Sequence, residues 1–462
     1  MALGPEFDQP VGRSFKRIDD AMSRGQDRLF RVLWFAVPPE SVARNVHFQA
    51  LMASRFLADL ALQALYFAAL IASARSGDSA LRAAAIGVAF LLPGVILGPW
   101  GGSVADAVPK RWALVGAYVT MGVLALLVPL TTGTGFVAML AILFLVRVLH
   151  QVSQPAEAAA APLVASHAEL ASANSFLSLS SSAGEVTGKA LLAPALVQFW
   201  GLRPVTVLAG LMFMLSALRV VRFRPESDHR TFDRTRVRRL GVIEAVRWLM
   251  EEPGAFWMLL LAAMASTINV VLATLGPQYV KQVLDVDPAL TFYVFAPASL
   301  GVVGGLLVAP VAMRLAGGRW VAVGGFTVVA IATAMMGQVH LISDWFGWAL
   351  LLDIPRVSDE VEMAAAISLV VGTGITIAAA ATQTYIGRYV PVAIHGRVFA
   401  LLGALKDGLA IPQLLLLGAV ATAVGVSAVI TVAPLALLVI AYGVARASTA
   451  WHGRRPQSRF ID

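Results

Sequence analysis

Apolar runs of about 20 residues recur along most of the chain, and each could cross a hydrocarbon core about 30 Å thick as a helix. None of these runs alternates apolar and polar residues, as the strands of a membrane barrel do. The pattern therefore predicts an all-α polytopic membrane protein. We expect twelve transmembrane helices, at 46–74, 80–102, 112–133, 135–156, 173–200, 203–221, 254–278, 289–313, 320–341, 363–389, 397–421 and 425–446.

The expected helices fall into two bundles of six. A short basic loop follows the second span of each half, 56 residues after the half begins: at Gly102 after Val46, and at Pro310 after Gly254. Two parallel six-helix repeats are typical of transporters. We expect five regions: a cytoplasmic N-terminal segment (1–45), a first bundle (46–222), a basic cytoplasmic linker (223–253), a second bundle (254–447) and a cytoplasmic tail (448–462). Within the first region, residues 15–33 place apolar side chains at helical spacing among basic ones, which indicates an amphipathic surface helix or a basic tail.

Composition and charge agree with this topology. Hydrophobic residues make up 58% of the chain and charged residues 13%, about half the charged share of a soluble domain, which excludes a soluble globular protein. If the N-terminus is cytoplasmic, the inner segments hold 26 of the 35 Lys and Arg residues and the outer loops hold five. The positive-inside rule then places both termini in the cytoplasm, for a multi-pass protein of the cytoplasmic (inner) membrane. Because the net charge of +8 follows the loops, it reflects the bilayer as a partner and not nucleic acid.

Several chemistries lack their motifs. There is no G-x-x-x-x-G-K-[ST] phosphate loop, so we expect gradient-driven rather than ATP-driven work. With no cysteine, no H-E-x-x-H and no cluster among the seven histidines, we expect no metal site and no cofactor. We expect no catalytic residues and no enzyme activity. The alternative, an intramembrane enzyme, would have to use Ser180 to Ser182 with Glu185 or His150.

The loop after the second span resembles a known signature. Gly102, Ala105, Asp106, Lys110 and Arg111 are similar to the G-x-L-A-D-R-x-G-R-R loop of the major facilitator superfamily, although Val104, Ala107 and Pro109 depart from it. The stretch PAEAAAAPLV from Pro155, and RYVPVAIHGRVFALLGA with Arg397, resemble the drug and macrolide exporters of the third drug:proton antiporter group. The resemblance covers roughly residues 45–447.

This resemblance implies a fold and a function. The fold would be the major facilitator fold, in which helices 1, 4, 7 and 10 of the twelve face a central cavity and helices 3, 6, 9 and 12 face lipid. The function would be proton-coupled export of an amphipathic organic molecule by alternating access, carried out by a monomer whose partners are a small-molecule substrate and protons. A lysophospholipid, other lipid or siderophore carrier is the alternative. The gating loops would contain Gly102, Asp106, Lys110, Arg111, Arg314, Arg319 and Arg397.

Ionisable residues inside the spans are functional candidates, because a charge at mid-membrane costs at least about 2.5–3.5 kcal/mol on insertion scales. Seven charged residues lie away from the ends of the spans, and all avoid the helices that the resemblance assigns to lipid: Arg55, Asp59, Arg147, Glu185, Lys189, Lys406 and Asp407. Asp59 is the first candidate for proton coupling, followed by Glu185 and Asp407. The alternative is that Arg55 with Asp59, and Glu185 with Lys189, only neutralise each other one helical turn apart. Polar residues at helical spacing form stripes on the first, fourth and fifth spans, and further polar or charged residues lie in the seventh, tenth and eleventh. Together they give the candidates for the substrate cavity: Arg55, Gln63, Tyr66, Arg147, Gln151, Ser178, Ser182, Lys189, Asn269, Gln383 and Lys406.

Overall fold

The computed structural model of the chain describes residues 42, 45–76, 79–106, 109–128, 136–160, 164, 170–221, 253–350, 358–389 and 395–452. The expected N-terminal surface helix (15–33) and the basic linker lie outside these residues. Within them, the secondary structure is entirely helical.

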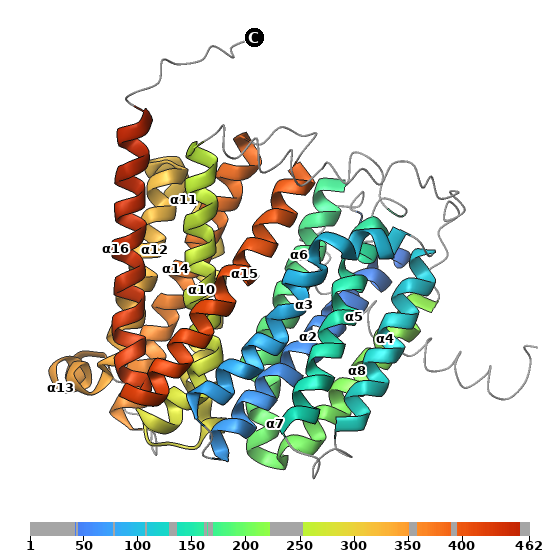
Figure 1. Cartoon of the computed structure of the whole chain (residues 1–462), viewed down its shortest axis with the longest axis horizontal. Helices are drawn as coiled ribbons and strands as arrows, with labels where there is room; N and C mark the ends of the chain where they lie inside the picture. Colours follow the sequence, from blue (N-terminus) through green and yellow to red (C-terminus); the bar gives the residue numbers. More distant parts are fainter. Residues whose placement is uncertain are drawn as a thin grey trace, which may run out of the picture.

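Among the described residues, the first half contains six helical segments, whose arrangement Figure 1 shows. In chain order they are α2 (Val46–Arg75), α3 (Ala80–Asp106), α4 (Lys110–Leu127), α5 (Phe136–Ala160), a continuous run of α6 (Leu170–Val186), η5 (Thr187–Leu192) and α7 (Ala193–Trp200), and α8 (Leu202–Val221). The segment η5 is a π-helix inside this run. Its wider turn carries an extra residue and shifts the faces on either side of it relative to a regular α-helix.

Within the described residues, the second half repeats this arrangement with two short additions, η7 and α13. It contains α10 (Pro253–Gln282), the short 3₁₀ helix η7 (Pro288–Leu290), α11 (Thr291–Ala316), α12 (Gly318–Gly337), α13 (Val339–Leu350), α14 (Asp359–Tyr389), α15 (His395–Val424) and α16 (Val426–His452). Figure 1 shows this group of helices beside the first, with α13 projecting at its edge.

The predicted spans correspond to observed helices. Each of the twelve coincides with a helix or, for 173–200, with the continuous run through η5. Among the described residues, ten helices are long and apolar enough to cross a membrane. The ninth span was predicted to reach residue 341, which is wrong: α12 ends at Gly337, and α13 then starts separately. His340 at the start of α13 bonds to the carbonyl of Val283, which ties this short helix to the segment after α10.

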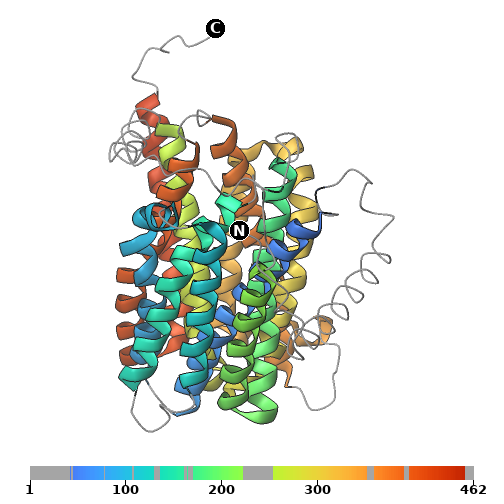
Figure 2. The same cartoon turned by 90° about the vertical axis from the view of Figure 1, so that its right-hand side faces the viewer.

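The two halves meet along defined helices. Within the halves, α2 packs on α6 and α8, and α14 packs on α11 and α12. Between them, α3 packs against α15, α10 packs against α2 and α3, and α11 reaches η5 (Figures 1 and 2). The α3 to α15 contact is the most extensive of these, so it forms the main seam between the halves.

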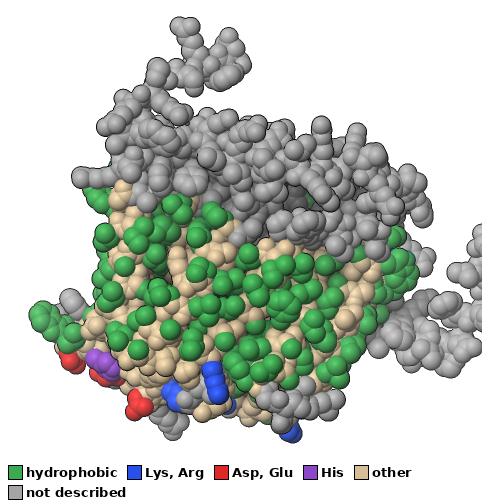
Figure 3. All heavy atoms as spheres, in the orientation of Figure 1, with side chains coloured by type: hydrophobic (Ala, Val, Ile, Leu, Met, Phe, Trp, Pro, Cys, Tyr) green, Lys and Arg blue, Asp and Glu red, His purple; other side chains and the backbone are tan. Residues whose placement is uncertain are grey.

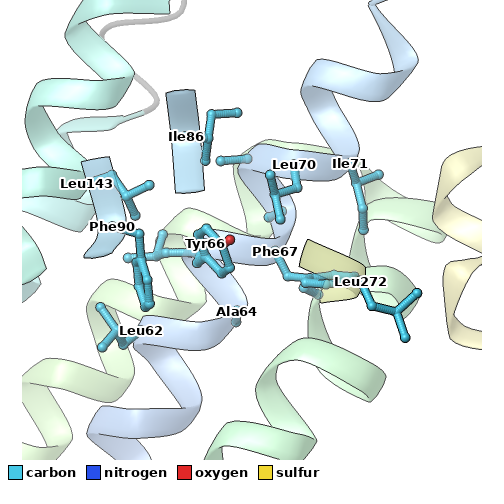
Figure 4. Packing of buried hydrophobic residues seen from close by; sticks show 14 of the residues in the cluster. Leu62, Ala64, Tyr66, Phe67, Leu70, Ile71, Ile86, Phe90, Leu143 and Leu272 are labelled. Carbon is cyan, nitrogen blue, oxygen red and sulfur yellow. The ribbon is translucent and has the colours of Figure 1, made fainter. Parts of the chain in front are cut away.

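Burial follows the expected membrane pattern. Apolar side chains spread across the middle of the described surface, while Lys, Arg, Asp and Glu gather at its lower edge in this view (Figure 3). Helix α2 lies innermost, with buried residues along most of its length. Its Tyr66 and Phe67 pack against Phe90 of α3 and Leu272 of α10, so the apolar core runs across both halves (Figure 4).

Candidate transport site

A cavity of about 130 Å³ lies between the two halves. Helices α2, α10, α11 and α14 and segment η5 all contribute to its wall, which is mostly apolar. Its polar groups include Lys189 from the first half and Asn269, Ser299 and Ser368 from the second. The volume is on the order of that which holds a single aromatic ring. A larger molecule would require the halves to move apart.

Lys189 reaches this cavity from the π-helical segment η5. Its Nζ donates to Glu185 Oε1 at 2.8 Å, and both side chains are partly exposed. The segment can lie close to α2 because Gly184 and Gly188 have no side chains: a Cβ on Gly188 would lie 2.4 Å from the Leu60 carbonyl oxygen. The glycine step therefore holds Lys189 at the cavity wall.

Asp59 is buried in a polar cluster between α2, α5 and α6. Its Oδ1 lies 2.9 Å from Nε2 of His150, and its Oδ2 accepts a hydrogen bond from Ser181. Arg147 Nη1 in turn lies 3.0 Å from Nδ1 of His150. The carboxylate thus has several partners besides Arg55, whose Nε lies 3.9 Å away.

Arg55 also contacts a second buried acid, Glu157 of α5. Arg55 Nη1 lies 3.3 Å from Glu157 Oε2, and the hydroxyl of Tyr118 donates to Glu157 Oε1. Glu157 is 2% exposed. The sequence analysis missed this residue because the fourth span was ended at 156, whereas α5 continues to Ala160. Arg55 therefore bridges two carboxylates and does not form an isolated pair with Asp59.

The stripe predicted on helix α2 divides between two environments. Tyr66 donates to or accepts from Thr274 of α10 at 2.7 Å and stacks on Phe90 at 4.2 Å, so it packs at the contact between the halves and does not line the cavity. Gln63 is half-buried where α2 meets Gly188. Gln151 is buried on α5 and lies near Gly94 of α3.

Asp407 connects the second half to this cluster. A Cβ on Gly94 would lie 2.3 Å from Asp407 Oδ2, so the carboxylate of α15 packs directly on the bare backbone of α3. Asp407 interacts electrostatically with Arg147 and with its neighbour Lys406. Arg147 also places its guanidinium 4.7 Å from the centre of the Phe90 ring.

Ionic contacts close the molecule at the end where α2 finishes. Arg75 pairs with Asp287 at 2.9 Å and donates to the carbonyl of Val197 at the end of α7. Lys281 of α10 donates to the carbonyl of Ala74 at 2.6 Å. Nearby, the backbone N–H of Leu81 donates to Thr422 of α15. Three of these contacts join the two halves, and the contact from Arg75 to Val197 lies within the first half. This end is therefore sealed.

The remaining candidates are more dispersed. Asn269 lines the cavity. The surroundings of Ser178, Gln383, Gly102, Asp106 and Arg397 lie outside the described set. Ser182 of the predicted stripe on α6 is exposed, and its neighbour Ser181 donates a hydrogen bond to Asp59. Among the gating candidates, Arg111 lies over Trp112, Arg314 donates to its own helix at Pro310, and Arg319 is exposed; Lys110 starts α4.

Comparison with known proteins identifies the family to which the chain belongs. The family model described as Major Facilitator Superfamily matches residues 51–411. The chain therefore belongs to the major facilitator superfamily. A search of curated proteins found no match.

Solved structures show the same fold at low sequence identity. A bacterial homolog of the human lysosomal transporter Spinster, inward-facing and unoccupied, has a TM-score of 0.69 at 14% identity, covering 91% of this chain and 100% of its own. A point mutant of the nucleoside transporter NupG gives 0.68 at 12%, covering 88% and 99%. A bacterial homologue of the iron transporter ferroportin, inward-facing, gives 0.63 at 16%, covering 87% and 98%. Two of these proteins are named for different cargoes, a nucleoside and iron, and at this sequence identity the similarities show the fold alone.

Proposed function

We propose that this protein is a proton-coupled exporter of an amphipathic organic molecule, acting by alternating access. The observation that carries the proposal is the cavity between the halves, whose walls come from α2 and η5 on one side and α10, α11 and α14 on the other. A site shared by two bundles opens to one side or the other as the bundles rock. The buried acids Asp59 and Glu157 and the half-buried Asp407 supply groups that could carry protons, whereas the side chain of Glu185 is 43% exposed.

The lining of the cavity indicates the kind of substrate. Phe67, Leu272 and Phe295 suit the apolar part of a substrate. Lys189 is a cation at the cavity wall, and we expect it to leave Glu185 and pair with an anionic group of the substrate. A molecule with an apolar body and one acidic group fits both features. A drug-like compound of this type is the first candidate.

A lysophospholipid is the second candidate, and a separate observation favours it. An apolar pocket of about 260 Å³ opens between α2 and α6, lined by Met52, Phe56, Leu179 and other residues. Leu179 is 55% exposed on this apolar surface. An acyl chain could occupy such a pocket, whereas a compact drug would not need it.

Topology and gating complete the proposal. The protein would act as a monomer in the cytoplasmic membrane with both termini inside, built from the bundles 46–222 and 254–447. The sealed Arg75 end would then face outward, in an inward-facing or occluded state. The connection between α3 and α4, with Asp106, would serve as the gating loop, so Asp106→Asn should slow turnover more than it weakens binding.

Reconstitution into liposomes tests the function. Purified protein would be given a pH gradient and a panel of fluorescent amphiphiles: a fatty acid, a lysophospholipid and an alkylammonium of matched chain length. We expect uptake of an acidic or zwitterionic member that ends when the gradient is collapsed by a protonophore. Uptake that follows a sodium gradient, or continues unchanged after the pH gradient is collapsed, would refute the proposal. Asp59→Asn should abolish the gradient-driven component while leaving exchange of the same amphiphile across the membrane.

A further inference from the structure

His150 occupies the centre of the buried cluster and uses both ring nitrogens. It is 3% exposed, on α5. Nδ1 lies 3.0 Å from Nη1 of Arg147, and Nε2 lies 2.9 Å from Oδ1 of Asp59. Two fixed partners on opposite sides of one imidazole determine where its protons lie.

The partners leave one tautomer. A guanidinium has only N–H donors, so Nδ1 of His150 must accept the hydrogen bond from Arg147. A neutral imidazole has one N–H, which therefore sits on Nε2 and is donated to Asp59. In this state the ring is neutral, and its one free proton acceptor is covered by Arg147.

We infer that the coupling proton binds at Nδ1 of His150 and that Arg147 competes with it for this nitrogen. This inference rests on the proposed proton coupling and moves its site from the acids to the histidine, with Asp59 stabilising the imidazolium through Nε2. Binding forms one N–H bond at Nδ1 and breaks the hydrogen bond from Arg147, with no other covalent change. The two cannot coexist, because a protonated Nδ1 has no lone pair for Arg147 and two cations would then adjoin.

The groups around Nδ1 of His150 stabilise either the bound proton or Arg147. When the proton is bound, the imidazolium faces the Asp59 carboxylate, which also holds Ser181. When Arg147 is bound, the same carboxylate stays close to the cation. The charged and titratable groups facing this cluster are Arg55 and Asp59 from α2, Tyr118 from α4, Arg147 and Glu157 from α5, Glu185 from α6 and Asp407 from α15.

Arg147 has other groups to interact with when it leaves the ring of His150. Its Nε has no hydrogen-bond partner within the described residues, and its guanidinium rests on the Phe90 ring. Asp407 attracts it from the opposite half, across the position of Gly94. Because α3 and α15 form the main seam, separating the halves there removes Asp407 from Arg147. The position of the second half thus biases whether Arg147 or a proton occupies His150, which couples conformation to protonation.

The first test needs no substrate. The chain has no cysteine, so Val137→Cys on α5 and Val424→Cys on α15, both exposed at the sealed end of opposite halves, can carry spin labels. Their distance distribution, measured by pulsed electron resonance between pH 5 and 9, should change with pH in the native background. His150→Gln keeps a donor and an acceptor but cannot be protonated, so its distances should stay constant. His340→Gln, which removes a histidine from exposed α13, is the matched control and should behave as the native protein.

Asp407→Asn tests the competition itself. Without the carboxylate, Arg147 should stay on Nδ1 in either position of the second half, so the distance change with pH should be lost or strongly reduced. A pH response that survives His150→Gln, or a native protein with no response, would overturn the inference.

Nitrogen-15 NMR of histidine-labelled native protein provides a readout that does not depend on any variant folding. At high pH one histidine should show the neutral Nε2–H tautomer with Nδ1 as a hydrogen-bond acceptor. Finding that every histidine is the Nδ1–H tautomer would overturn the inference. None of these measurements contains a substrate, so a failure of the liposome assay would count against the proposed function alone.

Discussion

Replacing Gly188 with alanine should weaken the contact between α2 and the π-helical segment that carries Lys189. The added Cβ would lie 2.4 Å from the Leu60 carbonyl oxygen and 3.1 Å from the Ala64 nitrogen. Ordinary contact begins at 3.4 Å, so the first distance falls about 1 Å short. Both obstructing atoms are backbone atoms, and therefore no side chain can rotate to make room.

The magnitude follows from two opposing effects. Overpacking a tight contact costs typically about 1–3 kcal/mol. Alanine in a helix interior recovers about 0.5–1 kcal/mol relative to glycine. Because helix α2 has to move as a body, we expect the cost to lie in the upper part of its range, for a net loss of about 1–2 kcal/mol.

Gly324→Ala is the matched control. This glycine lies in α12 with no atom within 4 Å of the position of an added Cβ, so alanine should raise stability by about 0.5–1 kcal/mol. The assay is the thermal unfolding midpoint of each purified variant in the same detergent. The Gly188 variant should melt below the native protein and the Gly324 variant at or above it. Equal midpoints for the two variants would refute the close-contact reasoning.

Three further results are expected. Partial burial raises the pKa of Asp287. Hydrogen bonds from Arg75 and from the Ala289 N–H, together with the nearby charges of Arg75 and Lys281, lower this pKa by more than burial raises it, so the net pKa is below its usual value. The charged form of Asp287 therefore stabilises the contact with Arg75 above about pH 4, and this stabilisation is lost as the pH falls below that value. Spin labels on the two halves at this end should detect the loss as an increase in their distance. Lys189→Met should weaken binding of an acidic amphiphile about tenfold or more and leave an alkylammonium unaffected, measured by competition in exchange assays. A cysteine at Asp353 should react with an impermeant thiol reagent in intact cells and one at Arg236 should not; the reverse labelling would contradict the proposed orientation.

Much of the fold is predictable from the sequence because hydrocarbon imposes a simple rule. Each span must be about 20 apolar residues long, and this length alone locates all twelve helical segments. The ends are less predictable. The helix α5 extends past the apolar run to Ala160, since Glu157 finds Tyr118 and Arg55 inside the protein instead of lipid or water. Segment η5 has no sequence signal of its own, because a run of apolar residues does not show where a helical turn gains a residue.

The sequence indicates which helices carry the candidate residues, but it does not indicate which side chains these residues contact. Periodicity places Arg55 and Asp59 on one face of α2, and the structure places both in the buried cluster. It cannot show that Arg55 reaches Glu157 or that Asp59 bonds to His150, 91 positions along the chain. Asp407 is a similar case: only the three-dimensional contact with Gly94 explains how an acid from the second half enters the first.

The ion pair at the sealed end differs from the inner cluster in its exposure to water. Arg75 and Asp287 are 32% and 44% exposed, whereas Asp59 and Glu157 are enclosed. Dissolved ions screen exposed charges over about 8 Å at physiological ionic strength but hardly reach buried ones. The salinity of the medium at that end therefore changes how firmly the halves are held there, while leaving the inner cluster unaffected.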